Sequence, residues 1–506
     1  MAKLENLHPL DEANRKLREN LRPTDWHNPE PQERYNLLVV GGGPAGLVAA
    51  SGAAGLGAKV ALVEKHLMGG DCLNVGCVPS KSVIHGSRIM HDLSEAREMG
   101  MEIPEPGPEQ FAATWERMRQ VRVRISENDS ARSLSEKGID LFLGDGRFVD
   151  AHCFEVDGKQ IRFKKALVCT GGRPKGLDVD GAEETGYLTN ETVFSITERP
   201  GRLVVLGGGP IGCELSQAFR RLGTQVTIIS DVDQFLPKED PDAATILRDQ
   251  FEREGIAMHF SAQVERLEKR EGEKLVHVVL GSGENETIVC DEILVAIGRA
   301  PNVEGLGLEN ANVECHRHGI AINDRFQTTA PHIFAAGDVA TRYKFTHAAD
   351  FAARAVIQNA LFFGRKKLSA MNMPWCTYTS PEIAHVGMYE ADARKKGIEV
   401  DTYKTDLADV DRAICENEDH GFVKIHVEKG KDKILGATIV ANHAGEMISE
   451  ISVAMAAGLG LGGLASVIHP YPTQAEAIRL TGDAYNRTRL TPFVAGLFKK
   501  WLAWTR

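Results

Sequence analysis

Hydrophobic residues in this chain of 506 residues gather in short runs that end at glycine. The run Leu37–Val40 leads into Gly41-Gly42-Gly43-Pro44-Ala45-Gly46 and a stretch of small residues, and a second run, Val60–Val63, ends at Glu64. Short apolar runs bounded by glycine are typical of buried strands, and the small residues after the glycines favour a helix. The pattern predicts a strand, glycine turn, helix and strand, the arrangement that binds a dinucleotide.

The glycine turn has a physical role in this arrangement. Glycines let the backbone approach a pyrophosphate, the helix N-terminus favours its charge, and the acid at the end of the second strand accepts hydrogen bonds from ribose hydroxyls. A glycine motif alone can be merely a tight turn, but here every flanking element is present. The residues expected to contact this first dinucleotide are Gly41, Gly43, Pro44, Ala45, Gly46, Glu64, Lys65, Gly70 and Asp71.

The same pattern occurs a second time, with strands at Leu203–Leu206 and Val226–Ile229 around a second glycine turn. Two such folds imply two dinucleotides, and FAD with NAD(P)H is the economical assignment. The position of the acid is held by Ser230, which favours NADPH because no carboxylate repels its 2′-phosphate; no arginine adjoins it, and Asp231 could still hold a ribose. The residues expected here are Gly207, Gly209, Ile211, Gly212, Ser230 and Asp231.

The turn at Thr170 and Gly171 takes the chain to the second fold, and the turn at Gly298 and Arg299 returns it to the first. Asp338 follows a strand and a glycine, so it could accept hydrogen bonds from ribitol hydroxyls, although a loop cap is the simpler role. A helix expected from Phe345 to Phe363 could aim its dipole at the flavin ring. The residues expected to line the cofactor here are Thr170, Gly171, Gly298, Arg299, Gly337, Asp338, Phe345 and Thr346.

Cys72 and Cys77 lie in a glycine-rich stretch directly after the first fold, with Gly70 and Asp71 before them and Lys81 after them. If Cys77 begins a helix and Cys72 lies in the loop before it, the sulfurs can meet as a disulfide, and the helix N-terminus and Lys81 favour a thiolate. A structural disulfide or half of a zinc site is the alternative. Zinc normally needs a second close pair, which the sequence lacks. We therefore expect a redox-active pair beside a flavin and no resident metal.

Composition narrows the function. The net charge of -11 argues against a nucleic-acid partner. Nine scattered cysteines suit a reducing compartment. No apolar run is long enough to span a membrane and no signal peptide is evident, so a cytoplasmic protein is expected. Leu4, Leu7, Leu17 and Leu21 predict a short N-terminal helical arm, which packs on the body or frays and carries no chemistry.

From about Met373 the sequence alternates strands with helices and carries no nucleotide signature, which indicates an α+β domain. The expected fold class is α/β, with two Rossmann-like dinucleotide-binding domains and a C-terminal α+β domain. The expected boundaries are an arm at 1–33, FAD-binding parts at 34–165 and 295–370, an NAD(P)-binding domain at 166–294, a dimerisation domain at 371–488 and a tail at 489–506.

Over roughly residues 35–485 the chain resembles the class I flavoprotein disulfide reductases, the family of lipoamide dehydrogenase, glutathione reductase and mercuric reductase. The resemblance is carried by both glycine turns, the cysteine stretch, the Ala-Ala-Gly337-Asp338 segment and His469-Pro470-Tyr471-Pro472-Thr473. The segment from Pro374 to Glu382 is most similar to the mercuric-reductase-like branch.

The resemblance implies that NAD(P)H reduces one FAD per subunit and that the flavin reduces a Cys72–Cys77 disulfide. Cys77 would face the flavin, Cys72 would meet the substrate, and Lys81 near the flavin would pair with Glu214; a helix-start residue is the alternative for Glu214. The C-terminal domain resembles the family's dimerisation domain, so we expect a homodimer in which the His469–Glu476 segment completes the partner's site.

The chain departs from the family at two places. Disulfide-reducing members carry a histidine where this chain has Tyr471, with a glutamate at the position of Glu476, and a phenol is a poor base at neutral pH. Mercuric reductase also carries tyrosine here. His469 could take part instead, although a structural hydrogen bond is its more usual role.

The second departure is that the tail lacks the vicinal cysteines that hand mercury to the buried thiols in mercuric reductase. Instead it places Phe493, Leu497, Trp501 and Trp504 on one face, with Lys499, Lys500 and Arg506 among the polar positions. This pattern is typical of an interfacial or partner-binding helix, and packing on the protein's own dimer is the simpler alternative.

Three functional interpretations follow. The leading one is an NAD(P)H oxidoreductase that uses FAD and the cysteine pair to reduce a metal ion, such as Hg(II), or another non-disulfide acceptor. The second is a dihydrolipoamide dehydrogenase-like oxidoreductase of disulfides or dithiols, with His469 as the base. The third is a non-enzymatic redox-sensing flavoprotein whose tail contacts a membrane or a protein partner.

Overall fold

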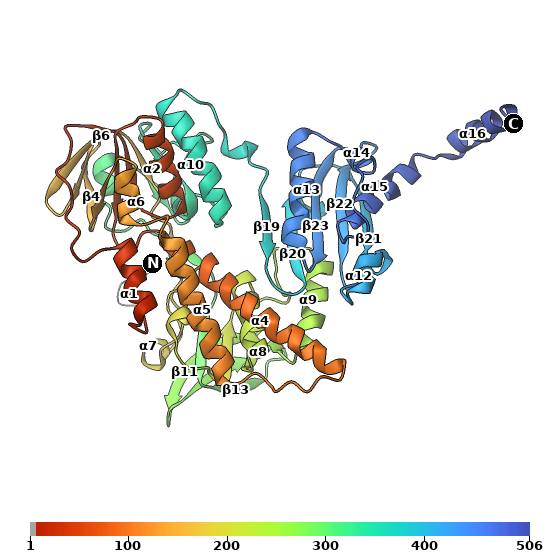
Figure 1. The fold of residues 1–506 in the computed structure, drawn as a ribbon, viewed down its shortest axis with the longest axis horizontal. Coiled ribbons are helices and arrows are strands. Elements are labelled where there is room, and N and C mark those ends of the chain that lie inside the picture. Colours follow the sequence, from red (N-terminus) through yellow and green to blue (C-terminus); the bar gives the residue numbers. More distant parts are fainter. Residues whose placement is uncertain (1–6) are drawn as a thin grey trace. The chain divides into compact units, whose positions relative to one another are not determined.

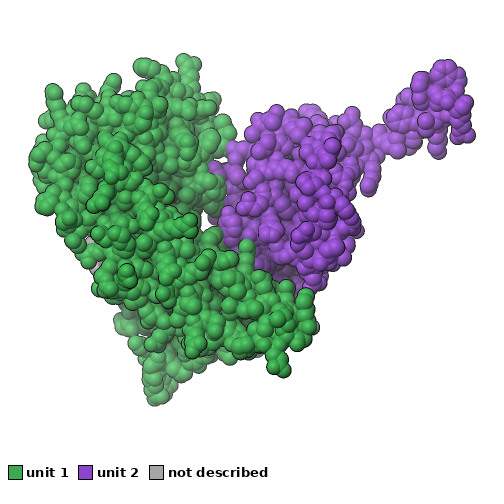
Figure 2. Space-filling model, viewed as in Figure 1, with its two compact units in different colours: residues 1–233, 255–371 green, residues 234–254, 372–506 purple. Residues whose placement is uncertain are grey.

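The computed structural model describes residues 7–506, so Leu4 lies outside the described residues. It contains two compact units, residues 1–233 with 255–371 and residues 234–254 with 372–506 (Figure 2). The finer division drawn from the sequence is not tested by this split and stays a prediction.

The first unit contains the sheet expected for the first dinucleotide (Figure 1). Strand β1 (Tyr35–Val40) pairs in parallel with β2 (Val60–Glu64) and with β6 (Lys159–Val168). The sheet is extended by β3 (Ile139–Leu143), β4 (Gly146–Asp150), β5 (Cys153–Val156) and β18 (Ile333–Ala335). Helices α2 (Pro44–Gly55) and α10 (Thr346–Leu361) pack against each other beside it. The apolar runs of the sequence are its buried core.

The second glycine turn lies in a four-stranded parallel sheet of order β10-β9-β8-β14. Its elements are β8 (Arg202–Leu206), α8 (Pro210–Arg221), β9 (Gln225–Ile229), β10 (Ala257–His259) and β14 (Glu292–Val295). A three-stranded antiparallel sheet adjoins it in sequence, formed by β11 (Gln263–Arg270), β12 (Glu273–Val279) and β13 (Asn285–Cys290). Leu215, Ala218 and Phe219 on α8 are buried, as an amphipathic helix requires.

Short elements complete the first unit. Strand β7 (Gly172–Pro174) pairs in antiparallel fashion with β15 (Arg299–Pro301), where the chain passes between the two folds. The others are α7 (Ala182–Thr185), η2 (Val193–Ser195), η3 (Leu308–Ala311), β16 (Cys315–His316), β17 (Gly319–Ile320), η4 (Gly337–Val339) and η5 (Leu368–Ala370).

The helices around the cysteine stretch are α1 (Glu12–Leu21), α3 (Gly70–Asn74), α4 (Cys77–Glu98), α5 (Pro108–Ser126) and α6 (Ala131–Glu136). Helices α5 and α6 are separate because Ser130 caps α6 and accepts the N–H of Ser133. The N-terminal arm packs on the unit through α1, whose Leu17 and Leu21 are buried.

The second unit is built on an antiparallel sheet of order β19-β20-β23-β22-β21. Its strands are β19 (Pro374–Thr377), β20 (Glu382–Gly387), β21 (Val400–Asp406), β22 (Phe422–Glu428) and β23 (Ile434–Ala441). Its helices are α9 (Pro241–Arg253), α11 (Glu390–Lys395), η6 (Leu407–Asp409), α12 (Asp411–Cys415), α13 (Ala444–Ala457), α14 (Leu461–Leu464), α15 (Glu476–Thr488) and α16 (Pro492–Trp504). The predicted α/β fold class is confirmed. Across residues 7–506, no helix has both the length and the hydropathy needed to cross a bilayer.

Candidate active site

The two cysteines of the site lie on consecutive helices. Cys77 is the first residue of α4, but Cys72 lies within the short helix α3, so the prediction that it lies in a loop is wrong. Gly69 and Gly70 have φ of +86° and +57°, and this left-handed backbone makes the sharp entry into α3 possible. Both cysteines are free thiols, and their sulfurs are hydrogen-bonded to each other.

The surroundings give the two thiols opposite acidities. The pKa of Cys77 is lowered to about 6, chiefly by the hydrogen bond with Cys72 and also by the hydroxyl of Thr346 and the charge of Lys81, against the opposing effect of burial. The same hydrogen bond, together with burial, raises the pKa of Cys72. The Thr346 hydroxyl lies 3.3 Å from the Cys77 sulfur and stands at the start of α10. The pair therefore holds one thiolate and one thiol at neutral pH.

Lys81 and Glu214 form an ion pair within the first unit. Lys81 Nζ lies 2.7 Å from Glu214 Oε2, and the Glu214 side chain is buried in α8, which packs on α4. The predicted pairing is therefore present. It places the ammonium one turn beyond Cys77, where the cation stabilises a thiolate. The role of Lys81 beside a flavin stays a prediction.

The first glycine turn is a backbone cradle that a side chain would fill. A Cβ at Gly41 would lie 2.5 Å from the carbonyl oxygen of Cys169, and one at Gly46 would lie 1.9 Å from the oxygen of Gly41. Gly43 faces Gly70, whose added Cβ would lie 2.7 Å from the Cα of Gly43. The turn is thus shaped for close approach of a pyrophosphate, and the cysteine stretch lies against it.

Glu64 is held rigidly at the end of β2. Its carboxylate accepts the N–H of Gly42 and the N–H of His66, both at 2.6 Å. Burial raises the pKa of Glu64, and these two N–H groups oppose the rise. This placement fits the expected ribose contact. Lys65, by contrast, turns away to an exposed ion pair with Asp145.

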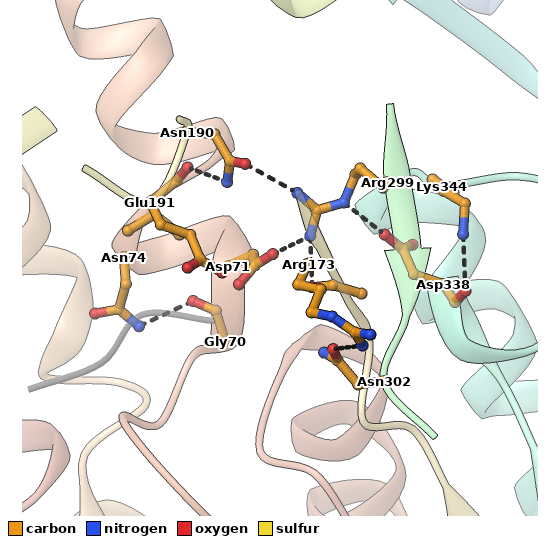
Figure 3. A network of polar contacts seen from close by, with 12 residues as sticks. Gly70, Asp71, Asn74, Arg173, Asn190, Glu191, Arg299, Asn302, Asp338 and Lys344 are labelled. Carbon is orange, nitrogen blue, oxygen red and sulfur yellow. Dashed lines mark hydrogen bonds and ion pairs between the residues drawn. The ribbon is translucent and has the colours of Figure 1, made fainter. Parts of the chain in front are cut away.

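Arg299 on β15 connects several residues expected at the cofactor (Figure 3). Its guanidinium contacts the carboxylate of Asp71, lies 3.5 Å from Asp338 Oδ2 and donates to the carbonyl oxygen of Gly172 at 2.7 Å. Burial raises the pKa of Asp338, and the charge of Arg299 opposes this rise. A Cβ at Gly337 would lie 3.9 Å from that of Ala45, which places Asp338 next to the start of α2. The guanidinium of Arg299 fits a phosphate, and the carboxylate of Asp338 fits the hydroxyls of a polyol.

Other predicted residues frame this edge. Thr170 donates to the carbonyl oxygen of Asn302 at 2.7 Å, Gly171 has φ of +71° with open space around it, and Phe345 caps the start of α10. The first glycine turn, Glu64, Asp338 and the thiols therefore lie within one continuous set of contacts in the first unit. These residues fit FAD.

The second glycine turn has the same enclosed backbone as the first, but the space in front of Gly209 is open. Gly207 and Gly212 are as tightly enclosed as Gly41 and Gly46, but a Cβ at Gly209 would meet nothing within 4 Å, and Ile211 is exposed. Ser230 is buried after β9, and Asp231 is exposed. Gly298 has φ of +113° beside Lys175. The cradle fits a second dinucleotide, such as NAD(P)H.

The remaining predicted residues lie in the second unit. The hydroxyl of Tyr471 donates to Asp411 Oδ2 at 2.7 Å, and the hydrogen bond and charge of Asp411 raise the pKa of Tyr471. His469 Nε2 lies 2.9 Å from Glu450 Oε1, with its side chain only 5% exposed. Glu476 binds Arg479 at 2.6 Å. The catalytic roles of Tyr471, His469 and Glu476 stay predictions.

Two arginines that contact the site do not stand out in the sequence. The buried Arg122 on α5 donates to the carbonyl oxygen of Asn74 at 3.0 Å and to the side chain of Asn14 at 2.9 Å, so it links the N-terminal arm to the cysteine stretch. Burial lowers the pKa of Arg122 to about 10. Arg22 donates to the carbonyl oxygens of Lys65 and His66. The arm thus contacts the site. The signal in the sequence was Arg122, an arginine on the apolar face of a helix.

In the described part of the chain, His, Cys, Asp and Glu side chains do not gather in groups of three or more that could hold a metal ion.

Comparison with known proteins gives consistent matches. Residues 35–353 match the family described as pyridine nucleotide-disulphide oxidoreductase, and residues 373–481 match its dimerisation domain. The mercuric reductase of Lysinibacillus sphaericus is 33% identical over 90% of this chain and 83% of its own length. The dihydrolipoyl dehydrogenase of Thermus scotoductus is 35% identical over 90% of this chain and 98% of its own.

Among solved structures, the Cu(II) complex of the HOCl-induced flavoprotein disulfide reductase RclA from Escherichia coli is similar, with a TM-score of 0.80 and 28% identity over 90% of this chain and 100% of that chain. The family matches together cover most of the chain, and these relatives are matched over 83% to 100% of their own length. The chain therefore belongs to the pyridine nucleotide-disulphide oxidoreductase family.

Proposed function

We propose that this protein is an FAD-dependent NAD(P)H oxidoreductase that passes electrons through the Cys72–Cys77 pair to a metal ion, such as Hg(II) or Cu(II), or to another non-disulfide acceptor. The observation that carries the proposal is the hydrogen bond from Tyr471 to Asp411. A phenol whose pKa is raised by a carboxylate does not exchange protons readily at neutral pH, as reduction of a disulfide requires.

The family uses FAD and NAD(P)H, and the two glycine cradles fit them. When bound, FAD accepts a hydride from NAD(P)H and supplies the electrons that open the disulfide. Glu64 would hold the ribose of FAD, Asp338 its ribitol and Arg299 its phosphates. The second cradle would hold NAD(P)H, with Ser230 beside the adenosine ribose.

The thiol pair has the properties that metal-ion reduction needs. Soft ions bind thiolates, and Cys77 is a thiolate at neutral pH. Oxidation of the Cys77 thiolate and the Cys72 thiol to the disulfide releases two electrons and one proton; the electrons reduce one Hg(II) to Hg(0) or two Cu(II) to two Cu(I), and the proton passes to the solvent. Lys81 stabilises the negative charge on Cys77, and Thr346 fixes its sulfur by a hydrogen bond.

The relatives support this acceptor class without deciding it. Mercuric reductases and dihydrolipoyl dehydrogenases both match over most of the chain, and one similar structure is a Cu(II) complex. A dithiol or disulfide acceptor is the second candidate, because His469 is paired with Glu450 in the manner of an oriented base. The dimerisation-domain match supports a homodimer in which the His469–Glu476 segment completes the partner's site.

The test is anaerobic oxidation of NADPH by the FAD-loaded protein, with thiol-buffered Hg(II), with Cu(II) and with lipoamide as acceptors. Metal-dependent turnover should fall by about a hundredfold or more in Cys72→Ala. It should survive in His469→Ala, and lipoamide should be a poor acceptor.

Two outcomes would contradict the proposal. Fast lipoamide turnover that His469→Ala abolishes and Tyr471→Phe retains would assign the protein to the second candidate. Slow turnover with every acceptor, in a protein whose flavin NADPH still reduces, would indicate a redox-sensing rather than a catalytic flavoprotein.

A further inference from the structure

Helix α16 carries a large apolar surface that the described part of its unit leaves open. None of its residues is buried, and Phe493 and Trp504 are 81% and 78% exposed. Figures 1 and 2 show it apart from the sheet of its unit, joined to α15 by residues 489–491. The family match ends at residue 481, so α16 lies outside the shared dimerisation domain. Exposed apolar surface of this kind marks an interaction site.

The apolar side chains cover more of the helix than a protein contact needs. At about 100° of rotation per residue, those of Phe493, Val494, Leu497, Phe498, Trp501, Leu502 and Trp504 span an arc of about 180°. A helix packed on a protein core typically shows a stripe of about 100°. In the remaining arc, Lys500 lies about 20° from one edge and Lys499 about 60° from the other. Lysines there can extend their ammonium groups to lipid phosphates while their stems stay apolar.

Charge indicates what the helix binds. The chain has a net charge of -11, yet no acidic residue follows Asp483, whereas Arg487, Arg489, Lys499, Lys500 and Arg506 are basic. This basic end is complementary to an anionic surface. The rings of Trp501 and Trp504 lie 5.4 Å apart on the apolar face, and tryptophan is the residue enriched where hydrocarbon meets lipid headgroups.

The length and cap of α16 agree with a helix that lies in the plane of a bilayer. Thirteen residues extend about 20 Å, which is too short to cross a hydrocarbon core of about 30 Å. Pro492 stands at the helix start, and the hydroxyl of Thr491 accepts the N–H of Val494. A helix of this length is marginal alone in water and gains stability at an interface.

We propose that α16 is an interfacial helix that binds this protein to an anionic lipid surface. The apolar arc enters the boundary between headgroups and acyl chains, and Lys499, Lys500 and Arg506 face the lipid phosphates. The reductase units remain in water, and the binding is reversible because a single short helix provides it.

The test is co-sedimentation of the FAD-loaded full chain with vesicles of phosphatidylcholine alone or with about 30% phosphatidylglycerol. The bound fraction should be at least about tenfold higher with phosphatidylglycerol and should fall in about 0.5 M NaCl. The double variants Trp501→Ser with Trp504→Ser and Lys499→Glu with Lys500→Glu should each lose binding. The matched control, Lys395→Glu with Lys396→Glu at the exposed C-terminal end of α11, should keep it.

A chain ended after Leu490 separates the alternatives. We expect it to leave the vesicles, keep its FAD and keep the molar mass that the full chain shows by light scattering. Binding that persists without α16, equal binding to uncharged vesicles, or a truncated chain that loses its partner copy would overturn the proposal, the last by assigning α16 to the dimer.

Discussion

Gly41 and Gly207 begin two turns of almost the same backbone conformation, with φ of +111° and +112°. Each is followed by a helix with proline in its first turn, and each helix begins against a carbonyl oxygen that excludes a Cβ. The surroundings differ. Gly43 faces Gly70 of the cysteine stretch, and Glu64 is fixed by two N–H groups, whereas Gly209 faces open space and Ser230 replaces the acid. The same backbone turn is therefore closely covered in the first fold and open in the second.

The largest expected effect comes from placing a methyl group in each cradle. In Gly46→Ala the Cβ would lie 1.9 Å from the oxygen of Gly41, and in Gly212→Ala 2.1 Å from the oxygen of Gly207. Because the carbonyl groups of Gly41 and Gly207 cannot move freely, each variant should lose about 3 kcal/mol or more of local stability. Gly46→Ala should be purified without its yellow cofactor, whereas Gly212→Ala should keep FAD and lose NADPH binding.

The measurement is the flavin absorbance per chain together with titration by NADPH. The contrast between the folds would be wrong if Gly212→Ala released FAD or if Gly46→Ala retained it. Gly57→Ala is the control, because an added Cβ there meets nothing within 4 Å, although its φ of +87° predicts a modest loss of stability from backbone strain alone.

The second prediction concerns the position after the second strand, where the first fold has an acid and the second fold has Ser230. Ser230→Glu would place a carboxylate where the 2′-phosphate of NADPH is expected, as Glu64 stands in the first fold. Repulsion and lost space should lower kcat/KM for NADPH by about 10- to 100-fold and affect NADH far less. Steady-state kinetics with both coenzymes decide the matter, and Asp231→Ala tests whether that neighbour holds the ribose instead. Equal losses with the two coenzymes would contradict the assignment of Ser230.

The elements that sequence could predict are those that local chemistry determines. The strands, the glycine turns and the helix start at Cys77 follow from apolar runs and from positions where a Cβ has no room. The contact of Arg299 with Asp71 joins positions 228 apart, so no local pattern encodes it. The position of Cys72 in a helix was missed because Gly69 and Gly70 suggest a loop, and the break after α5 depends on a single capping serine. The contacts that Asn14 and Arg22 of the N-terminal arm make are not marked by any sequence motif.

The third prediction concerns the thiolate that the first fold keeps beside its cradle. With a pKa of about 6, Cys77 in the reduced protein should be about one-tenth ionised at pH 5 and nine-tenths at pH 7. Its alkylation by iodoacetamide should therefore rise about tenfold over this range and level off above it. Cys213 beside the second cradle is buried and should stay unmodified.

Peptide mass spectrometry after timed alkylation gives the rates site by site. Cys72→Ala removes the largest cause of the shift, so the midpoint for Cys77 should move upward toward the ordinary thiol value of about 8.5. A midpoint already above 8 in the unsubstituted protein would show that the hydrogen bond with Cys72 does not hold the thiolate.

The smallest effect is expected at the N-terminal arm, whose contacts with the cysteine stretch are a further difference between the first fold and the second. Asn14→Ala leaves one donor of the buried Arg122 without its partner, and an unpaired buried donor costs about 1–3 kcal/mol. We expect a decrease in Tm of a few degrees and faster loss of FAD on dilution, because Arg122 also holds the carbonyl oxygen of Asn74 in the cysteine stretch. Asn20→Ala is the matched control, since Ser126 still donates to Val123 without it. If the two variants behaved alike, the arm would serve only as packing, and the enclosure of the first cofactor would depend on the glycine turn and the cysteine stretch alone.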